Sequence, residues 1–429
     1  MTVTLRKFAN PGADTTSVPS AEVLQNATVQ CLVLGKYATA NNFALETFML
    51  HLQSCFLTRG REPVDFWFGM GVIIRLAFRC GYHRDPSTLA NLSPFDGEMR
   101  RRVWLNIVQI DALMSFQMGF PSMIPSQFCD TKDPLNLQHA DLRIDMTELP
   151  VPRPLTETTP VSYLIVKSSV MKVFRKIVES TQSLTVPPYS ETAALNAEIR
   201  RVYSELPEQY QPRDIGYAFT DAAVLILERC TIELLYLKGI IVLLRQFISY
   251  DQDETMHASL RHECVDAALA ILSRQADVNK ACEPGGRLGE DRWIMTSLAP
   301  SDFLLGAMVV CRHLSVTMRS SNVPSADDRE FAQRQYKALQ TAHRIFSQQA
   351  GQSRDMRLAT EAIDLMLRKV AEKDHTALVV EPPSASADKF AMEGLQQWHA
   401  DSISQMIDGS DVIDWVSEMQ PYTTESLLI

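Results

Sequence analysis

Apolar residues recur every three or four positions along most of this chain, and this spacing restricts the fold more than any other feature of the sequence. The first clear stripe lies within 45–56 and consists of Leu45, Phe48, Met49, Leu52, Cys55 and Phe56. Such spacing puts one apolar face on an α-helix. Alternation typical of β-strands is nearly absent. The sequence therefore predicts an all-α fold, a multi-helix array of packed antiparallel helical hairpins in one large domain.

Proline and glycine mark the ends of the predicted helices. The second apolar stripe should end at Gly81, because glycine suits the left-handed conformation of a helix C-terminus. The next helix should begin with Ser93 as its N-cap, since Pro94 follows at the first helical position, and it should end at Gly119 and Pro121. Its predicted apolar face consists of Met99, Val103, Ile107, Ile110 and Met114.

The later helices follow a stretch that cannot be one helix. Prolines are scattered through 125–160, so we expect a long ordered loop there. Further helices are predicted at roughly 161–182, 191–205, 219–249, 256–278, 299–319, 327–350 and 354–373. The predicted domain organisation is a disordered N-terminus (1–20), one helical domain (21–375), a linker (376–400) and an acidic-hydrophobic tail (401–429).

The predicted tail combines acidic and apolar residues. It contains six Asp or Glu residues and no Lys or Arg, and its apolar residues include Ile413, Trp415, Val416 and Met419. The acids keep such a segment solvated, while a partner groove can bind the apolar side chains, as in an activation-type interaction segment. Two alternatives remain open: a disordered solubilising sequence, and a terminal helix that docks on the domain.

No residue pattern in the chain predicts an active site or a metal centre. The Gly69–Gly71 segment begins like a nucleotide-binding fingerprint, but it lies in a helical stripe without a preceding strand, so close helix packing is the favoured interpretation. His257, His262 and Cys264 can bind metals, yet steps of five and two residues do not put them on one helix face. We therefore expect no enzymatic activity.

Cysteine spacing, charge and hydropathy exclude further classes. None of the 8 cysteines belongs to a Cys-x-x-Cys pair, which argues against a structural zinc site, and we expect no cofactor in this chain. The formal net charge of -10 is atypical of a compact DNA-binding domain. Charged residues interrupt the most apolar stretch, 222–248, so no membrane span is expected.

Arg100, Arg101 and Arg102 form the dense basic run of the sequence. Consecutive residues of a helix point in different directions, so the three guanidinium groups cannot form one flat patch for phosphate. Ion pairs with carboxylates of neighbouring elements, with partial stacking on Trp104, are the favoured interpretation. Direct DNA contact is the alternative.

Residues 76–125 hold a further set of residues in a fixed order. Its members are Gly81, His83, Arg84, Asp85, Glu98, Arg101, Arg102, Trp104, Asp111, Ser115, Gly119 and Pro121. In this order the segment resembles the fungal-specific transcription factor domain, the middle homology region of zinc-cluster transcription factors. Segments 235–247 and 264–268 resemble two later helices of that family. The chain departs from the family pattern at Phe120, where an arginine is usual, and at Gln246, where a proline is usual.

The resemblance implies a transcription regulator in the nucleus that controls a biosynthetic gene cluster for a secondary metabolite. It also implies regulatory, ligand-responsive or dimerising roles for the helical domain. The implied partners are the transcription machinery or co-regulators, DNA, and a second subunit in a homo- or heterodimer. The six-cysteine, two-zinc module that normally precedes this domain is not found in the sequence. No DNA-binding or zinc-binding residue can therefore be assigned, and zinc is expected only if such a module precedes the chain.

A second hypothesis follows from the same observation. The chain is then a domain-only binding or dimerisation module, a co-regulator or a ligand-binding protein, without DNA-binding activity of its own.

Overall fold

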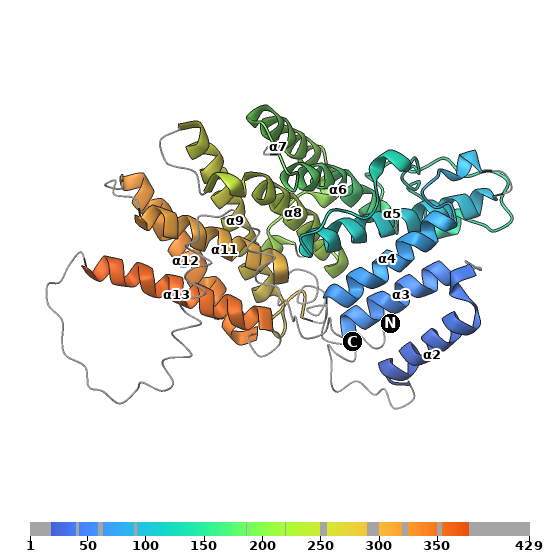
Figure 1. Cartoon of the computed structure of the whole chain (residues 1–429), viewed down its shortest axis with the longest axis horizontal. Coiled ribbons are helices and arrows are strands. Elements are labelled where there is room, and N and C mark those ends of the chain that lie inside the picture. The colour runs from blue at the N-terminus through green and yellow to red at the C-terminus, as the bar shows by residue number, and fades with distance from the viewer. Residues whose placement is uncertain are drawn as a thin grey trace. The chain divides into compact units, whose positions relative to one another are not determined.

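The computed structural model describes residues 19–39, 43–58, 63–89, 92–185, 187–218, 220–248, 255–289, 300–319, 325–349 and 354–376. Helices are the regular elements of these residues, and the predicted all-α class is confirmed (Figure 1). The α-helices are α2 (Ala21–Leu34), α3 (Ala44–Thr58), α4 (Pro63–Arg79), α5 (Pro94–Gln117), α6 (Ser162–Thr181), α7 (Tyr189–Ser204), α8 (Ala223–Leu244), α9 (Thr255–Ala281), α11 (Pro300–Arg319), α12 (Ala326–Gln349) and α13 (Arg354–Thr376). Short 3₁₀ helices are η1 (Tyr37–Thr39), η2 (Pro86–Thr88), η3 (Ser126–Phe128), η4 (His139–Asp141), η5 (Glu208–Tyr210), η6 (Ile215–Tyr217) and η7 (Arg245–Ile248).

Each helix predicted from an apolar stripe is present, with ends that differ from the prediction by a few residues. Helix α2 was not predicted individually. Its N-cap is Ser20, whose hydroxyl accepts a hydrogen bond from the Val23 amide at 3.3 Å. Within α2, Gln25 and Leu32 are the buried residues. A helix that buries so few apolar side chains leaves no stripe for periodicity to detect.

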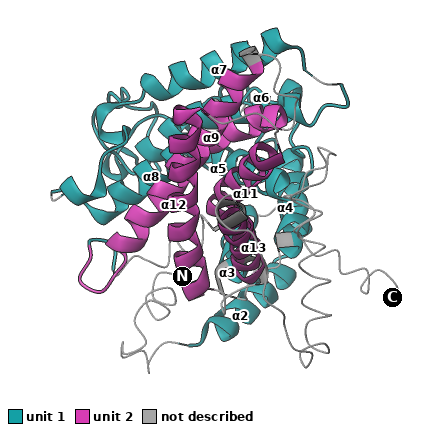
Figure 2. Ribbon diagram, turned by 90° about the vertical axis from the view of Figure 1, so that its left-hand side faces the viewer, with its two compact units in different colours: residues 1–236, 287–297 teal, residues 237–286, 298–429 magenta. Residues whose placement is uncertain are grey.

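The described helices form two compact units (Figure 2). The described residues of unit 1 lie within 19–236 and 287–289, and those of unit 2 within 237–286 and 300–376. The prediction placed the helices in one domain over 21–375, and its boundaries stay a prediction.

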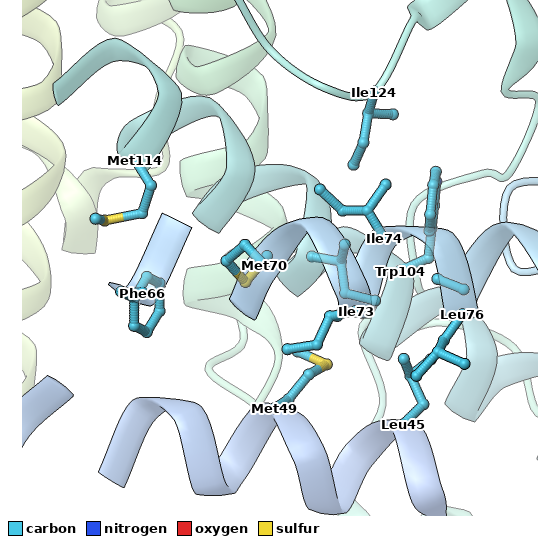
Figure 3. Close-up of a cluster of buried hydrophobic side chains, with 12 residues drawn as sticks. Leu45, Met49, Phe66, Met70, Ile73, Ile74, Leu76, Trp104, Met114 and Ile124 are labelled. Carbon is cyan, nitrogen blue, oxygen red and sulfur yellow. The ribbon is translucent and has the colours of Figure 1, made fainter. Parts of the chain in front are cut away.

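Unit 1 is built by helices that pack in the order of the chain, α2 on α3, α3 on α4, α4 on α5, α5 on α6 and α6 on α7. Side chains from α3, α4, α5 and the following loop form one buried apolar cluster (Figure 3). Its buried members are Leu45, Met49, Phe66, Met70, Ile73, Ile74, Leu76, Ala77, Trp104, Ile107, Met114 and Ile124. Within this packing, a Cβ atom on Gly69 would lie 2.6 Å from Leu52 Cδ1, so the predicted close packing at this glycine is confirmed.

Helix α5 begins and ends as predicted, but its buried surface is not the predicted apolar face alone. The Ser93 hydroxyl accepts a hydrogen bond from the Asp96 amide at 3.0 Å and so caps the N-terminus. Of the predicted face, Ile107 and Met114 are buried, whereas Met99, Val103 and Ile110 are half-buried. Five polar residues of α5 are buried as well, namely Glu98, Arg102, Gln109, Asp111 and Ser115. These polar residues belong to a second buried side that apolar periodicity cannot reveal.

A long ordered loop joins α5 to α6, as predicted. It contains the two short 3₁₀ helices η3 and η4 and no α-helix. Ile124 and Leu137, each 1% exposed, bury apolar side chains from this loop. The loop is therefore part of the packed structure of unit 1.

Unit 2 is a second helical cluster. Helix α9 packs on α11 and α12, and both α11 and α12 pack on α13. Each of the four helices contributes fully buried side chains, among them Ile271, Val309, Leu339, Ile363 and Met366.

Several predicted segments lie outside the described residues. They are 1–18 of the predicted N-terminus and 377–429, which holds the linker, the acidic-hydrophobic tail and its residues Ile413, Trp415, Val416 and Met419. Among the described helices, none has the length and apolar character needed to span a membrane.

Candidate functional site

Three carboxylates of the 76–125 segment are buried, and each accepts a hydrogen bond from a main-chain amide of the loop after α5. The pairs are Asp85 with the Lys132 amide (3.0 Å), Glu98 with the Leu135 amide (3.2 Å) and Asp111 with the Met123 amide (3.3 Å). A buried loop must satisfy its amides without a neighbouring strand or helix turn. We call Asp85, Glu98 and Asp111 the loop-anchoring carboxylates.

Asp85 has the most donors of the three. The Arg101 guanidinium donates from Nη2 to Oδ1 at 2.9 Å and from Nε to Oδ2 at 3.1 Å. The Ser87 hydroxyl donates to Oδ1 at 2.6 Å, and the Ser87 amide does so at 3.1 Å. Burial alone would raise the pKa of Asp85, but the hydrogen bonds from Arg101, Ser87 and Lys132 outweigh it and hold that pKa well below its usual range.

Glu98 and Arg102 form an ion pair one helical turn apart on α5. Arg102 Nε donates to Glu98 Oε1 at 2.9 Å, and the side chains are 9% and 0% exposed. Burial raises the pKa of Glu98, although the Arg102 guanidinium and the Leu135 amide act in the opposite direction. The pair thus holds a charged group of α5 in the interior and fixes the loop at Leu135.

Asp111 anchors the start of the same loop. It accepts hydrogen bonds from the Ser122 hydroxyl at 2.5 Å and from the Ser115 hydroxyl at 3.2 Å. Arg175 of α6 reaches the same place, because its Nη2 donates to the Ile124 carbonyl at 2.7 Å. Burial raises the pKa of Asp111, against the effect of these donors and of the nearby arginine.

A more exposed ion pair, between Arg84 and Asp130, lies next to Asp85. Arg84 donates from Nε to both carboxylate oxygens of Asp130 at 3.1 Å, and these side chains are about half exposed. Asp130 Oδ1 also accepts from the Asp85 amide at 2.7 Å. The Asp130 amide donates to the His83 carbonyl at 3.0 Å. The loop is therefore bound to the α4–α5 connection through main chain as well as side chains.

The structure differs from the prediction in the ring on which the arginine run stacks, and the difference concerns Arg100. Its guanidinium carbon lies 4.6 Å from the centre of the Tyr82 ring, and its Nη1 donates to the Cys80 carbonyl at 2.8 Å. The stacking partner is therefore Tyr82 and not Trp104, because the Trp104 ring packs edge-on against Phe78 at 5.7 Å. Residues one position apart on α5 point to different neighbours, as the predicted spread of the three arginines requires.

His83 lies in an aromatic setting. Its ring centre is 4.8 Å from that of Phe78 and 6.5 Å from that of Trp104. Its Nδ1 is buried without a hydrogen-bond partner among the described residues. Burial lowers the pKa of His83, which favours the neutral ring in this packing.

Two glycines of the segment end helices with a positive φ. Gly81 has φ +75° and Gly119 has φ +71°. After α4, the Tyr82 amide donates to the Ala77 carbonyl at 3.0 Å, the bond that defines a Schellman C-cap. After α5, the Phe120 amide makes the equivalent bond to the Ser115 carbonyl at 2.8 Å.

Phe120, the residue that departs from the family pattern, has an aromatic partner. Its ring stacks on Trp67 of α4, with centroids 5.1 Å apart. Pro121 follows as an exposed residue and begins the loop.

Sequence reasoning missed Asn136, which organises the second half of the loop. Its Oδ1 accepts from the Thr159 hydroxyl at 2.7 Å and from the Ser162 hydroxyl at 2.8 Å. Its Nδ2 donates to main-chain carbonyls at 153, 154 and 157, at 2.9 to 3.2 Å. A lone asparagine in a proline-rich stretch carries no sequence signal for such a role.

The network has the character of a scaffold. A general acid or base must face a substrate, whereas the loop-anchoring carboxylates are occupied by donors of the chain itself. Within the described residues, no three His, Cys, Asp or Glu side chains gather to hold a metal ion. Cys264 is fully buried, while His262 is exposed and stacks on Phe331, so these two diverge as predicted. The expected absence of a cofactor stays a prediction.

Comparison with known proteins gives the same segment a family. Residues 44–152, which include all the signature residues above, match the family described as the fungal specific transcription factor domain. The chain is 38% identical to the Zn(2)-C6 fungal-type transcription factor pigI of Monascus ruber, over 80% of this chain and 43% of that protein. It is 32% identical to the fusarisetin A cluster transcription factor fsa6 of a Fusarium species, over 80% of this chain and 45% of that protein.

The equisetin cluster transcription factor eqxF of Fusarium heterosporum is 31% identical, over 80% of this chain and 49% of that protein. The alignments thus span less than half the length of these relatives. No solved structure matches the chain. The matched segment thus belongs to an all-α domain whose long loop is held by buried acidic side chains. Residues 44–152 of the chain carry the fungal specific transcription factor domain.

Proposed function

We propose that this chain is a nuclear transcription regulator that controls a biosynthetic gene cluster through its helical domain. The observation that carries the proposal is the 38% identity over 80% of the chain to a protein named as a fungal-type transcription factor. The names of further relatives refer to the fusarisetin A and equisetin clusters. The family match at 44–152 supports the same assignment.

In this proposal the three consecutive arginines of α5 hold parts of the helical domain in place. Arg101 and Arg102 are 12% and 9% exposed in their side chains and pair with Asp85 and Glu98. Arg100 is bound to Tyr82 and the Cys80 carbonyl. Phosphate contacts need free cationic side chains on the surface, which supports a scaffold role for this basic run under the proposal.

The chain has no enzymatic activity under this proposal. Its partners are the transcription machinery or co-regulators, and the predicted tail residues Ile413, Trp415, Val416 and Met419 are the candidate contact. That segment lies outside the described residues. A fusion of residues 381–429 to a heterologous DNA-binding module should raise reporter transcription, and a flat signal would contradict this role for the tail.

The test of the function is a gene deletion in the native host, with transcripts of the neighbouring biosynthetic genes measured by RNA sequencing. We expect those transcripts to change at least several-fold and to recover when the wild-type gene is restored. An Asp85→Ala variant should fail to restore them, because the loop loses its anchor. An Asp145→Asn variant, in an exposed pair, should restore them. Unchanged transcripts after deletion would contradict the proposed function.

The internal use of Arg100, Arg101 and Arg102 also favours the second hypothesis, a binding or dimerisation module without DNA affinity of its own. A gel-shift experiment with the purified chain and promoter fragments separates the two. Binding that is sequence-specific and weakens with salt would exclude the module without DNA affinity.

A further inference from the structure

Helix α9 of unit 2 carries an arginine on its buried face. Cys264, Val265 and Ala268 lie three, four and seven residues after Arg261 and are each 0% exposed. This spacing puts Arg261 on the same stripe of the helix. Arg261 itself is 5% exposed. The Arg261 side chain therefore occupies a position that the helix otherwise gives to apolar side chains.

Arg261 differs from the other buried cations because it has no carboxylate. The buried cationic residues of the described part are Arg102, Arg229, Lys238, Arg261 and Arg274. Four of them have an acidic partner within 4.0 Å, the pairs being Arg102–Glu98, Arg229–Asp221, Lys238–Asp302 and Arg274–Asp277. For Arg261 the described residues provide neither an ion pair nor a hydrogen bond. Burial without compensation lowers the pKa of Arg261.

Asp328 of α12 and Asp266 of α9 are engaged elsewhere. Asp328 accepts from the amide and the hydroxyl of Ser325, at 2.9 and 2.7 Å. Asp266 pairs with the exposed Arg334 at 3.5 Å. A buried cation is expensive to hold unless a counter-charge satisfies it. Among the residues that the structure describes, no acid supplies that counter-charge to Arg261.

Two imidazole rings and one aromatic ring meet where α9, α11 and α12 pack on one another. His313 of α11 is 4% exposed, and its Nδ1 lies 2.9 Å from Gln335 Oε1 of α12. The charge of Arg261 is one of the influences that lower the pKa of His313. The Phe331 ring of α12 lies 5.8 Å from His313 and 4.7 Å from His262, the neighbour of Arg261.

We propose that Arg261 binds the carboxylate of a small organic acid, whose apolar part lies against His262, His313 and Phe331. The planar guanidinium fork matches a carboxylate with two parallel hydrogen bonds. One carboxylate neutralises the single unpaired charge. Few polar groups in an otherwise apolar setting are typical of small-molecule sites. This inference concerns unit 2 alone and stands whether or not the chain regulates transcription.

The test uses the purified full chain and two probes of the same shape, benzoate and its neutral amide, benzamide. The melting temperature is measured against the concentration of each probe at constant ionic strength. Benzoate should raise the melting temperature and reach saturation, because a ligand that binds the folded state stabilises it. Benzamide should leave it unchanged. Equal effects of the two probes, or no effect of benzoate, would mean that Arg261 is satisfied by water alone and would overturn the proposal.

Two variants locate the effect. Arg261→Gln should abolish the benzoate response, and Arg368→Gln, which removes an exposed arginine of α13 in the same unit, should keep it. Should Arg261→Gln not fold, Arg261→Lys keeps the charge but loses the fork, and its apparent affinity for benzoate should fall about tenfold. A full benzoate response in either Arg261 variant would overturn the assignment of the site.

Discussion

Arg101 and Asp85 form a two-pronged ion pair that is almost sealed from solvent. The two hydrogen bonds measure 2.9 and 3.1 Å, and the side chains are 12% and 3% exposed. The same carboxylate accepts the Lys132 amide from the loop after α5. One side chain thus couples α5, the α4–α5 connection and the loop.

The first prediction concerns this pair. Asp85→Asn should lower the free energy of unfolding by roughly 3–5 kcal/mol, because it leaves the Arg101 charge buried without a counter-charge. Urea unfolding followed by circular dichroism measures the change. Asp145→Asn removes a pair whose side chains are 71% and 75% exposed, and it should change stability by less than about 1 kcal/mol. Similar losses in both variants would contradict the role of burial.

The second prediction concerns pH and His313. Burial, together with nearby cations, lowers the pKa of His313 to about 4 from an ordinary value of 6.5. Between these values the unfolded chain binds a proton that the folded chain does not. The stabilising contribution is therefore complete above pH 6.5 and is lost as the pH falls toward about 4, by up to about 3 kcal/mol.

Melting temperatures between pH 4 and 7.5 test this. His313→Gln should flatten the decrease below pH 6.5, whereas the exposed control His139→Gln should keep the wild-type profile. A His313→Gln profile parallel to that of the wild type would refute the assignment to His313.

The third prediction concerns the turn after α4. Gly81 has φ +75°, and a Cβ there would meet no atom closer than 4.0 Å, so a side chain would suffer from backbone conformation and not from crowding. Gly81→Ala should cost about 1–2 kcal/mol, and Gly81→Asn should cost less, since asparagine tolerates the left-handed region better. Chemical denaturation of the two variants measures both losses. A Gly81→Asn variant that is less stable than Gly81→Ala would contradict the conformational explanation.

The fourth prediction concerns the approach of α3 and α4. Gly69→Ala should destabilise the chain by roughly 1–3 kcal/mol, because the new methyl group would lie 2.6 Å from Leu52 Cδ1. Combining it with Leu52→Ala makes room for that methyl group. The double variant should therefore lose less stability than the sum of the two single losses. Strict additivity would show that the two residues do not compete for space.

The helix ends were predicted correctly where the residue that caps or ends the helix acts on neighbours only a few positions away in the sequence. Ser93 caps the amide three residues later, and Gly81 and Gly119 adopt the conformation that their lack of a side chain permits. Apolar stripes located α4, α6 and the later helices for the same reason, since their signal lies within a few turns.

The loop-anchoring roles could not be predicted because their partners are distant in sequence. Glu98 and the Leu135 amide are 37 residues apart, and Asp85 and the Lys132 amide are 47 apart. The family resemblance marked Asp85, Glu98 and Asp111 as signature residues but gave no partner for them. A polar residue buried on α5 reads from sequence as a surface residue, since burial depends on the loop that covers it.

The anchors of the loop meet main-chain amides, and this has a consequence for how the loop can change. Every residue except proline offers the same N–H group, so the contacts at Met123, Lys132 and Leu135 do not depend on which side chains stand there. The three acids therefore hold the path of the loop and leave most of its composition free to vary. Proline at any of these three positions is the one substitution that would release its anchor directly.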